Sequence, residues 1–445
     1  MRKTTQIRIF SISLIGAVVL SACGSPAAET SVPIAPSATP AGIATAPPPA
    51  VTISSVGEGT PAATEAGVTP TEAAAEEEVA DADPLLGPGS YPPGVNPLTG
   101  LTVADPEVLN RRPLSIKISN FPRYVRPQAG LGVADIVWEH YSEGGTSRFS
   151  AVFFAANAPR VGPIRSARLI DTTLTEMFDG ALVTSGSSRG TMERLYRKPW
   201  FDLVISEETG YQCPPLCRES EDTNSVFAST EELWNTLQAA GLNAAPQLDG
   251  GLAFQRQPPA SGRAANLVRV DYSSEAHSEW RYSEVANRYH RWVDVSQTEL
   301  EPHTDQLDGL HIAVENVVLL FANHVVDFSV PEDFDAGGAS SHFATEIQLW
   351  LTGAALVFRD GQVYEATWQR METDEMLSIV DAFGNPLALH PGRTWFHIVG
   401  AKSVVSENAP AWTIVHKSPR DFIVQPPTET PAPGTEPAAS ATPEG

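Results

Sequence analysis

The alternation of apolar and polar residues predicts both strands and helices between residues 96 and 241. Residues 114–119 alternate strictly, so a half-buried strand is expected there, with Lys117 on the face opposite the core. Further strands are expected at 134–140, 148–155 and 181–184, and helices at 169–178, 191–197 and after the capping box at 229–232. The pattern therefore predicts a mixed α/β domain over residues 91–241.

Strand signals dominate after residue 267. Runs rich in β-branched and aromatic residues predict strands at 289–293, 312–321, 355–358, 363–370, 376–380 and 395–399. Asp360-Gly361 predicts a hairpin turn, because both residues tolerate a positive φ. Residues 242–266 are expected to be a linker or long loop. The predicted fold class is α+β, with an N-terminal mixed α/β domain followed by a β-rich, meander or sandwich-like domain at 267–425.

The N-terminus has the pattern of a lipoprotein signal peptide. Three basic residues within the first eight precede a short apolar run at 9–20. As a helix this run would be about 18 Å long, too short for a bilayer core of about 30 Å. The run ends in Leu20-Ser21-Ala22-Cys23, which resembles the bacterial lipobox, whose cysteine thiol accepts a diacylglycerol. We therefore expect a signal peptide at 1–22, a lipid on Cys23 that anchors the chain to the cell membrane, and an extracytoplasmic location.

Composition predicts disordered segments on both sides of the folded part. Residues 24–90 contain eleven prolines and nine acids but no Lys, Arg or aromatic residue, so little apolar surface is available to offset the entropy of ordering. We expect residues 23–90 to be the lipidated cysteine and a flexible tether, and residues 426–445 to be a disordered tail. The formal net charge of -24 argues against a nucleic-acid partner, which would require a basic face.

The cysteines and histidines indicate a structural disulfide rather than a metal centre. Cys213 and Cys217 are separated by three residues, two of them proline, and a disulfide closing a small loop is the favoured interpretation outside the cytoplasm. His303, His311 and other histidines lack the i, i+4 pairing or the cysteine neighbours that are typical of zinc sites. No metal site and no cofactor are predicted.

Two loops rich in Arg, Ser and Gly are the best candidates for a binding site. Residues 162–168 and 185–190 each lie between a predicted strand and a predicted helix, and they would share one sheet edge if the strands were parallel. Exposed N–H groups at a helix start attract anions, and arginine adds a bidentate donor for phosphate or carboxylate. The candidate ligand-binding residues are Arg148, Arg165, Ser166, Arg168, Ser187, Ser188 and Arg189.

An alternative interpretation assigns these arginines a purely structural role. In an acidic protein they could neutralise nearby carboxylates. The acids close to them in the sequence are Glu139, Glu143, Asp171 and Asp179.

Several motifs resemble those of a known family. They include Asn96-Pro97-Leu98-Thr99-Gly100, Ala134-Asp135-Ile136-Val137-Trp138-Glu139, Gly162-Pro163-Ile164-Arg165-Ser166-Ala167-Arg168 and Gly392-Arg393-Thr394-Trp395. In this order they resemble the YerB-like bacterial lipoproteins, a two-part family of unknown biochemical function. The resemblance spans roughly residues 96–425 and implies two modules in one lipoprotein. It supplies no catalytic residues.

Two classes of function follow from these features. In the first, the chain is a non-enzymatic envelope lipoprotein that binds an anionic or saccharide cell-wall component, or an envelope protein, through the Arg/Ser-rich loops. In the second, the same loops belong to a hydrolase or transferase acting on a wall polymer. Residues 186–190 fit the Gly-x-Ser-x-Gly pattern with Ser188 at the centre, but the local sequence offers no histidine base held by an acid. We expect a binding protein, with catalytic residues unknown.

Overall fold

The structure is a computed structural model that describes residues 83–332 and 342–419. The predicted signal peptide, Cys23, most of the predicted tether and the predicted tail at 426–445 lie outside these residues. Residues 83–90, which composition assigns to the tether, pair with residues 250–257. Leu86 and Phe254 exchange two backbone hydrogen bonds, at 2.9 and 2.8 Å.

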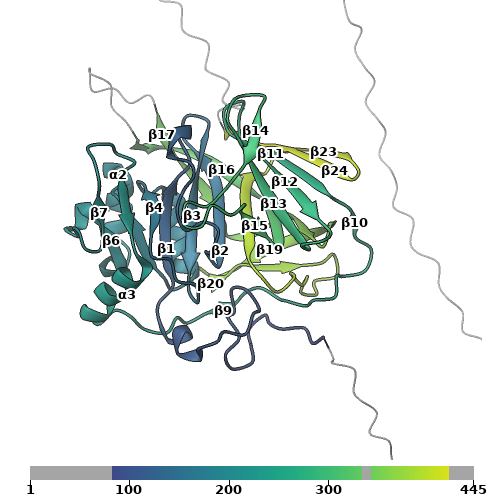
Figure 1. Ribbon diagram of the computed structural model, residues 1–445, viewed down its shortest axis with the longest axis horizontal. Helices are drawn as coiled ribbons and strands as arrows, with labels where there is room; N and C mark the ends of the chain where they lie inside the picture. Colours follow the sequence, from purple (N-terminus) through teal and green to yellow (C-terminus); the bar gives the residue numbers. More distant parts are fainter. Residues whose placement is uncertain (1–82, 333–341, 420–445) are drawn as a thin grey trace, which may run out of the picture. The chain divides into compact units, whose positions relative to one another are not determined.

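Strands in two large sheets make up most of the described chain (Figure 1). The fifteen-stranded sheet runs in the order β10 (Arg263–Ala264), β19 (Gln362–Arg370), β18 (Leu351–Arg359), β16 (Asn316–Pro331), β22 (Thr394–Gly400), β2 (Ile136–Ser142), β3 (Thr146–Phe153), β1 (Leu114–Ser119), β4 (Val161–Ile164), β8 (Val226–Ala228) and β7 (Cys217–Arg218). Four further strands extend it: β17 (Phe343–Gln348) on β16, β21 (Ser378–Val380) on β19, β5 (Ala181–Thr184) on β1, and β6 (Val204–Ser206) on β5.

The second sheet has seven strands and comes entirely from the C-terminal half. Its order is β14 (Leu300–Pro302), β13 (Arg288–Asp294), β12 (His277–Ser283), β11 (Leu267–Asp271), β24 (Ala411–Val415) and β23 (Val404–Asn408), with β15 (Ala313–Val314) on β13. A separate pair is formed by β9 (Asp249–Gly250) and β20 (Glu375–Met376). The α-helices of the described residues are α1 (Leu169–Met177), α2 (Arg189–Tyr196) and α3 (Thr230–Ala239). No helix in this part of the chain is long and apolar enough to span a membrane.

The predicted α+β class, with a mixed α/β domain at the N-terminus, is wrong. The structure is mostly β, with 41% strand and 13% helix and only three α-helices in the described part of the chain. The expected helices do form, but they are short. The N-terminal strands join the C-terminal strands in one sheet through the parallel pairing of β2 with β22. The proposed domain boundary at 242–266 stays a prediction, and the first sheet takes strands from both sides of it.

Local sequence signals explain individual connections. Asp360 and Gly361 have φ of 53° and 70° and join β18 to β19 in a tight antiparallel hairpin, as the sequence predicts. The capping box expected at Ser229 is not formed, because its hydroxyl makes no capping hydrogen bond, although α3 begins at the next residue.

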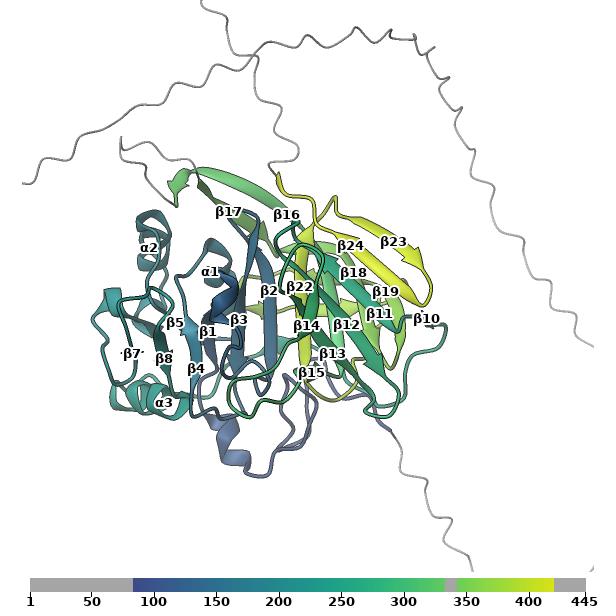
Figure 2. The ribbon, with the colours of Figure 1, turned by 45° about the horizontal axis from the view of Figure 1, so that its top comes forward.

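The two sheets pack face to face, and the alternation along β22 shows how. Trp395 points toward the second sheet and packs against Trp280 of β12, with ring centroids 5.2 Å apart. The next residue, Phe396, points to the opposite face and stacks on Trp138 of β2 at 4.1 Å. The face of the first sheet that carries Phe396 is covered by α1, whose buried residues include Leu174 (Figure 2). The central strands are therefore buried on both sides.

A buried ion pair joins the sheets at the centre of their interface. Glu139 of β2 accepts hydrogen bonds from the guanidinium of Arg291 at 2.9 Å, from Trp395 Nε1 at 3.1 Å and from Ser147 Oγ at 2.8 Å. Arg291, on β13 of the second sheet, is 0% exposed. Burial alone would raise the pKa of Glu139, but the charge of Arg291 holds this pKa below its usual 4.5. Glu139 therefore stays ionised inside the protein.

The ion pair continues into a chain of hydrogen bonds that returns to the N-terminal half. Arg291 donates to His303 Nδ1 at 2.7 Å, so His303 must carry its proton on Nε2. That Nε2–H then donates to Gln128 Oε1, also at 2.7 Å. Burial, together with the charge of Arg291, lowers the pKa of His303 well below 6.5 and keeps its ring neutral.

We expect Arg291→Leu to lower the free energy of unfolding by about 3–5 kcal/mol, because it leaves the Glu139 charge buried without a partner. The double variant Glu139→Gln, Arg291→Leu should lose much less than the sum of the single losses. The stabilisation that ionised Glu139 adds to the free energy of unfolding is present above about pH 4.5, and it should be lost as the pH falls through the lowered pKa of Glu139.

Urea unfolding measures these losses, with Arg256→Leu, at an exposed arginine, as the control expected within about 0.5 kcal/mol of wild type. Additive losses in the double variant would contradict a coupled pair.

Candidate functional site

The structure brings the two Arg/Ser-rich loops together beside the end of β1. The Ala167 N–H donates to Gly186 O at 2.8 Å, and Thr184 Oγ1 donates to Arg165 O at 2.8 Å. The sequence argument required the two strands that lead into the loops to be parallel, but they are not. β5 runs parallel to β1 and β4 runs antiparallel to it. The loops meet because both strands end near the same part of β1.

Beneath the loops lies a fully buried polar cluster centred on Lys117. Lys117 Nζ lies 2.9 Å from Asp171 Oδ1, 3.0 Å from Ser150 Oγ and 2.5 Å from His140 Nε2. Each of these side chains is 0% exposed. Asp171 also accepts the Arg168 backbone N–H at 2.6 Å, which ties the start of α1 to the sheet. The sequence pattern wrongly predicted a half-buried strand here, because the carboxylate that compensates Lys117 comes from a distant helix.

Burial determines the protonation of this cluster. It lowers the pKa of Lys117 to about 8, although the neighbouring charge of Asp171 opposes the shift. It also lowers the pKa of His140 well below 6.5, with Lys117 acting in the same direction. His140 Nδ1 donates to Tyr141 O at 2.8 Å, so Nε2 is free to accept from the Lys117 ammonium. The cluster therefore holds one cation, one carboxylate and one neutral imidazole.

Arg168 lies above this cluster between two buried carboxylates. Its Nε lies 2.6 Å from Glu143 Oε2, and its Nη1 lies 3.2 Å from Glu332 Oε2. The side chains of Arg168, Glu143 and Glu332 are only 13%, 6% and 5% exposed. Ser188 Oγ donates to Glu332 Oε1 at 3.0 Å and caps α2 by accepting the Thr191 N–H. Arg168 and Ser188 thus hold the loops in place.

Arg148 and Arg165 are in a different situation from Arg168. Arg148 lies on β3 and makes one hydrogen bond among the described residues, to Ser166 O at 2.6 Å. The side chain of Arg165 makes none within the described ranges, and its Nε is a buried donor without a partner. Burial lowers the pKa of both arginines, and the charge of Arg168 lowers them further. The charge of Asp222 opposes the shift at Arg165, and those of Glu143 and Glu332 oppose it at Arg148, but neither arginine forms an ion pair with a described residue.

The remaining candidate residues lie outside this arginine cluster. Arg189 is 88% exposed on the side-chain scale and pairs with Glu193 one helical turn away. Ser187 donates to the Ser188 carbonyl. Ser187 and Arg189 both line a separate depression of about 540 Å³ beside α2. The cluster therefore consists of Arg148, Arg165, Ser166, Arg168 and Ser188.

The acids named as structural partners of these arginines have mostly different partners. Glu139 pairs with Arg291, Asp171 pairs with Lys117, and Asp179 pairs with Arg112 at 2.5 Å. Glu143 alone pairs with a candidate arginine, Arg168. The sequence could not separate these cases, because three of the four pairings join segments that are more than 50 residues apart in the chain.

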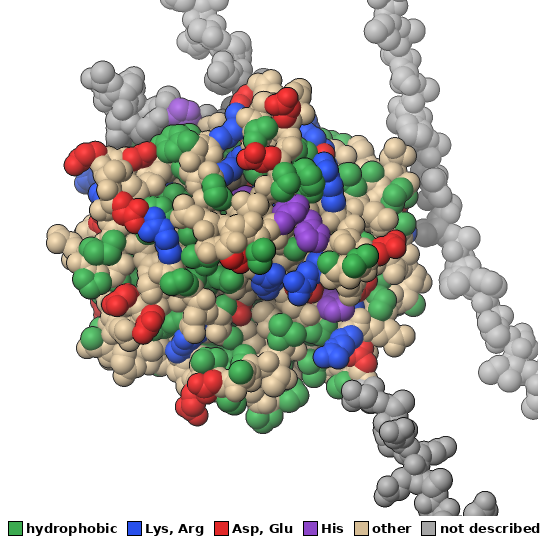
Figure 3. All heavy atoms as spheres, viewed as in Figure 1, with side chains coloured by type: hydrophobic (Ala, Val, Ile, Leu, Met, Phe, Trp, Pro, Cys, Tyr) green, Lys and Arg blue, Asp and Glu red, His purple; other side chains and the backbone are tan. Residues whose placement is uncertain are grey.

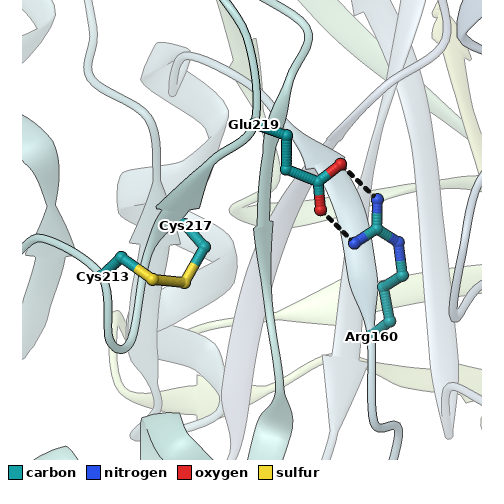
Figure 4. Close-up of a disulfide and its surroundings, with 4 residues drawn as sticks. All are labelled: Arg160, Cys213, Cys217 and Glu219. Carbon is teal, nitrogen blue, oxygen red and sulfur yellow. Dashed lines mark hydrogen bonds and ion pairs between the residues drawn. A yellow bond between two sulfur atoms is a disulfide. The ribbon is translucent and has the colours of Figure 1, made fainter.

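Cys213 and Cys217 form a disulfide at the edge of the first sheet, with Cα atoms 4.4 Å apart (Figure 4). Close to it, Arg160 forms a two-pronged ion pair with Glu219, one contact being 2.8 Å long, and stacks over Phe227 at 3.5 Å. Within the described ranges, no group of three or more His, Cys, Asp or Glu side chains could hold a metal ion.

Family comparisons agree with the sequence motifs. Residues 98–243 match the N-terminal domain, and residues 268–396 the C-terminal domain, of a protein family of unknown function, DUF3048. The chain belongs to this family.

A relative's sequence and a solved structure confirm the resemblance to YerB-like proteins. YerB of Bacillus subtilis (strain 168), a candidate lipoprotein, is 29% identical over 314 residues, which cover 68% of this chain and 85% of YerB. The crystal structure of B. subtilis YerB matches with a TM-score of 0.55 and 28% identity, covering 68% of this chain and 96% of that chain.

We expect Arg168→Ala to lower the free energy of unfolding by about 3 kcal/mol, because Glu143 and Glu332 would remain buried without their cation. Arg168 stabilises the ionised form of Glu143, whose pKa is lowered in the folded state. The loss should therefore be full at pH 7 and shrink as the pH falls below about 4.5. Arg189→Ala, at an exposed pair, should change stability by less than about 0.5 kcal/mol in the same denaturation series. Equal losses in the two variants would contradict the assignment.

Proposed function

We propose that this chain is a lipid-anchored lipoprotein of the bacterial envelope that binds an anionic group of a cell-wall component at its arginine cluster. The lipid on Cys23 would hold the folded part outside the cytoplasm, and Arg148 and Arg165 would supply the donors. The relative YerB supports the lipoprotein part of this proposal through its description as a candidate lipoprotein.

The unpartnered guanidinium of Arg165 is the observation that carries the binding proposal. A buried donor without a hydrogen bond costs about 1–3 kcal/mol, and buried polar groups in proteins are almost always paired. Arg165 Nε has no partner in the described part of the chain, although the protein has 53 acidic residues against 29 basic ones. An incoming anion would supply the missing acceptor.

The arrangement around Arg165 suits a phosphate or carboxylate. Arg148 and Arg168 lie close enough for their charges to lower the pKa of neighbouring guanidinium groups, so an anion would relieve repulsion as well as accept hydrogen bonds. Arg168 is already paired with Glu143 and Glu332, whereas Arg148 and Arg165 form no ion pair among the described residues. The Lys117–Asp171 cluster holds the loop from below and keeps these donors in position.

We do not extend the proposal to hydrolase or transferase chemistry. Ser188, the serine at the centre of the Gly-x-Ser-x-Gly pattern, donates to Glu332 and accepts from the Thr191 N–H. These are the contacts of a helix cap, and they leave its hydroxyl oriented for structure rather than for attack on a carbonyl.

Isothermal titration of the detergent-solubilised full chain with inorganic phosphate tests the arginine cluster. Wild type is expected to bind phosphate at one site, and Arg165→Ala should weaken that binding at least ten-fold, which corresponds to about 1.4 kcal/mol. Arg256→Ala removes an exposed arginine that lines a different depression, and should leave the affinity unchanged. Binding that is absent in wild type, or that survives Arg165→Ala, would overturn the proposal.

The lipid anchor has its own test. Mass spectrometry of the mature chain from its native host is expected to show an N-terminal peptide beginning at Cys23 with a diacylglycerol attached. The full chain should sediment with membranes, and Cys23→Ser should shift it out of the membrane fraction. An unmodified Cys23 in the mature chain would contradict the anchor.

A further inference from the structure

Four surface depressions lie next to one another, because each shares lining residues with the next, and together they are called the furrow. The depression of about 540 Å³ beside α2 shares Arg197 with one of about 420 Å³ between α1, α2 and β17. That depression shares Trp350 with a third of about 300 Å³ beside β18. The third shares Asn323 and Gln348 with a fourth of about 280 Å³, which reaches Gly400 at the end of β22. In Figure 2 these elements follow one another from α2 through β17 and β16.

The furrow is basic on a protein that is acidic as a whole. Its lining contains seven bases and four acids, whereas the whole chain carries 29 bases and 53 acids. The bases are Arg189, Arg194, Arg197, Lys198, Arg370, Lys402 and Lys417, and the acids are Glu176, Glu193, Glu208 and Glu346. On the face shown in Figure 3, by contrast, acidic and basic side chains are interspersed. Arg189, Arg194 and Lys198 are already paired with carboxylates and Arg370 is buried, so Arg197 is the base that argues for an anionic ligand.

Two side chains near the middle of the furrow are available for a ligand. Trp350 is 39% exposed, although most of the other tryptophans of the described chain are buried. It lies at the junction of two depressions, where a flat ligand could stack on its ring. The Arg197 guanidinium, at the junction before it, makes no ion pair or hydrogen bond with the described residues. Its neighbour Arg194 is already paired with Asp327 at 2.7 Å.

The chemistry of the lining favours a sugar chain over a nucleic acid. A single-stranded nucleic acid is bound mainly through its phosphates, and the four carboxylates along the furrow would repel these phosphates. An acidic glycan also carries free hydroxyls on every sugar, which can donate to those carboxylates and bond to side-chain amides such as those of Asn323 and Gln348. The polarised C–H groups on the face of a pyranose ring are attracted to the negative face of an indole.

We infer that this furrow binds a linear, acidic oligosaccharide, with Trp350 stacking on one ring and Arg197 pairing with a carboxylate. The inference goes beyond the anion site at Arg148 and Arg165, because the furrow is lined by other residues. Its extent, over four adjoining depressions, suits several consecutive sugar units rather than one small anion.

Titration of the detergent-solubilised full chain with tetragalacturonate, a carboxylated tetrasaccharide, tests the inference by calorimetry. Wild type is expected to bind it, and to bind the neutral maltotetraose at least ten-fold more weakly. Trp350→Ala and Arg197→Ala should each weaken tetragalacturonate binding at least five-fold, and Trp350→Phe should retain most of the affinity. Arg256→Ala serves as the matched control at a separate depression and should bind as wild type does. Thermal unfolding of each variant checks that it is folded.

Three results would overturn the inference that the furrow binds an acidic oligosaccharide. The first is that tetragalacturonate fails to bind wild type, and the second is that Trp350→Ala and Arg197→Ala bind it unchanged. The third is that single-stranded dT10 binds more tightly than the glycan. Arg165→Ala separates this inference from the arginine cluster, because it should weaken phosphate binding and leave tetragalacturonate binding within two-fold. Loss of glycan binding in Arg165→Ala alone would assign the ligand to the cluster and contradict the furrow.

Discussion

The architecture depends on charges that are buried on both faces of one strand. Glu139 and His140 are consecutive residues of β2, so their side chains point to opposite faces of the first sheet. On one face Glu139 pairs with Arg291 of the second sheet, and on the other His140 contacts Lys117, which pairs with Asp171 of α1. A buried charge is tolerated only when its partner is in place, so the two pairs fix how the second sheet and the first helix sit on β2.

The proposed anion site follows from the pair on the helix side. Asp171 compensates Lys117 and accepts the Arg168 N–H, which fixes the loop between β4 and α1. Arg168 is in turn neutralised by Glu143 and Glu332 from two other segments. Arg148 and Arg165 form no ion pair among the described residues, although Asp222 lies near enough to Arg165 to oppose the lowering of its pKa. The absence of ion pairs to described residues at these two guanidinium groups is our reason for proposing an anion site at this position.

Local patterns predicted the elements well and their assembly poorly. The strand at 114–119, the strand at 181–184 and the Asp360-Gly361 turn agree with the structure, because period-two alternation and turn chemistry are properties of neighbouring residues. The fold class was wrong because the pairing of β2 with β22 joins segments about 260 residues apart, and no local pattern records it. Lys117 was expected on a solvent face for the same reason. Its partner Asp171 lies on a helix 54 residues further along the chain, and the alternation within the strand carries no information about that contact. The arginines and serines of the loops were found from composition and position, but which arginine lacks a partner depends on contacts with Glu332 and Ser166, which only the folded chain provides.

The side-chain NMR signal of Arg165 reports the central claim most directly. Within the described residues its Nε–H is one of two buried arginine Nε–H donors without an acceptor, and the other, that of Arg291, lies in the core between the sheets. The account predicts that, as phosphate is added to the full chain, one arginine Nε–H resonance shifts downfield to saturation, and that this resonance is missing from the spectrum of Arg165→Ala. If every arginine Nε–H resonance stays in place at saturating phosphate, the loops hold their arginines for structural reasons alone.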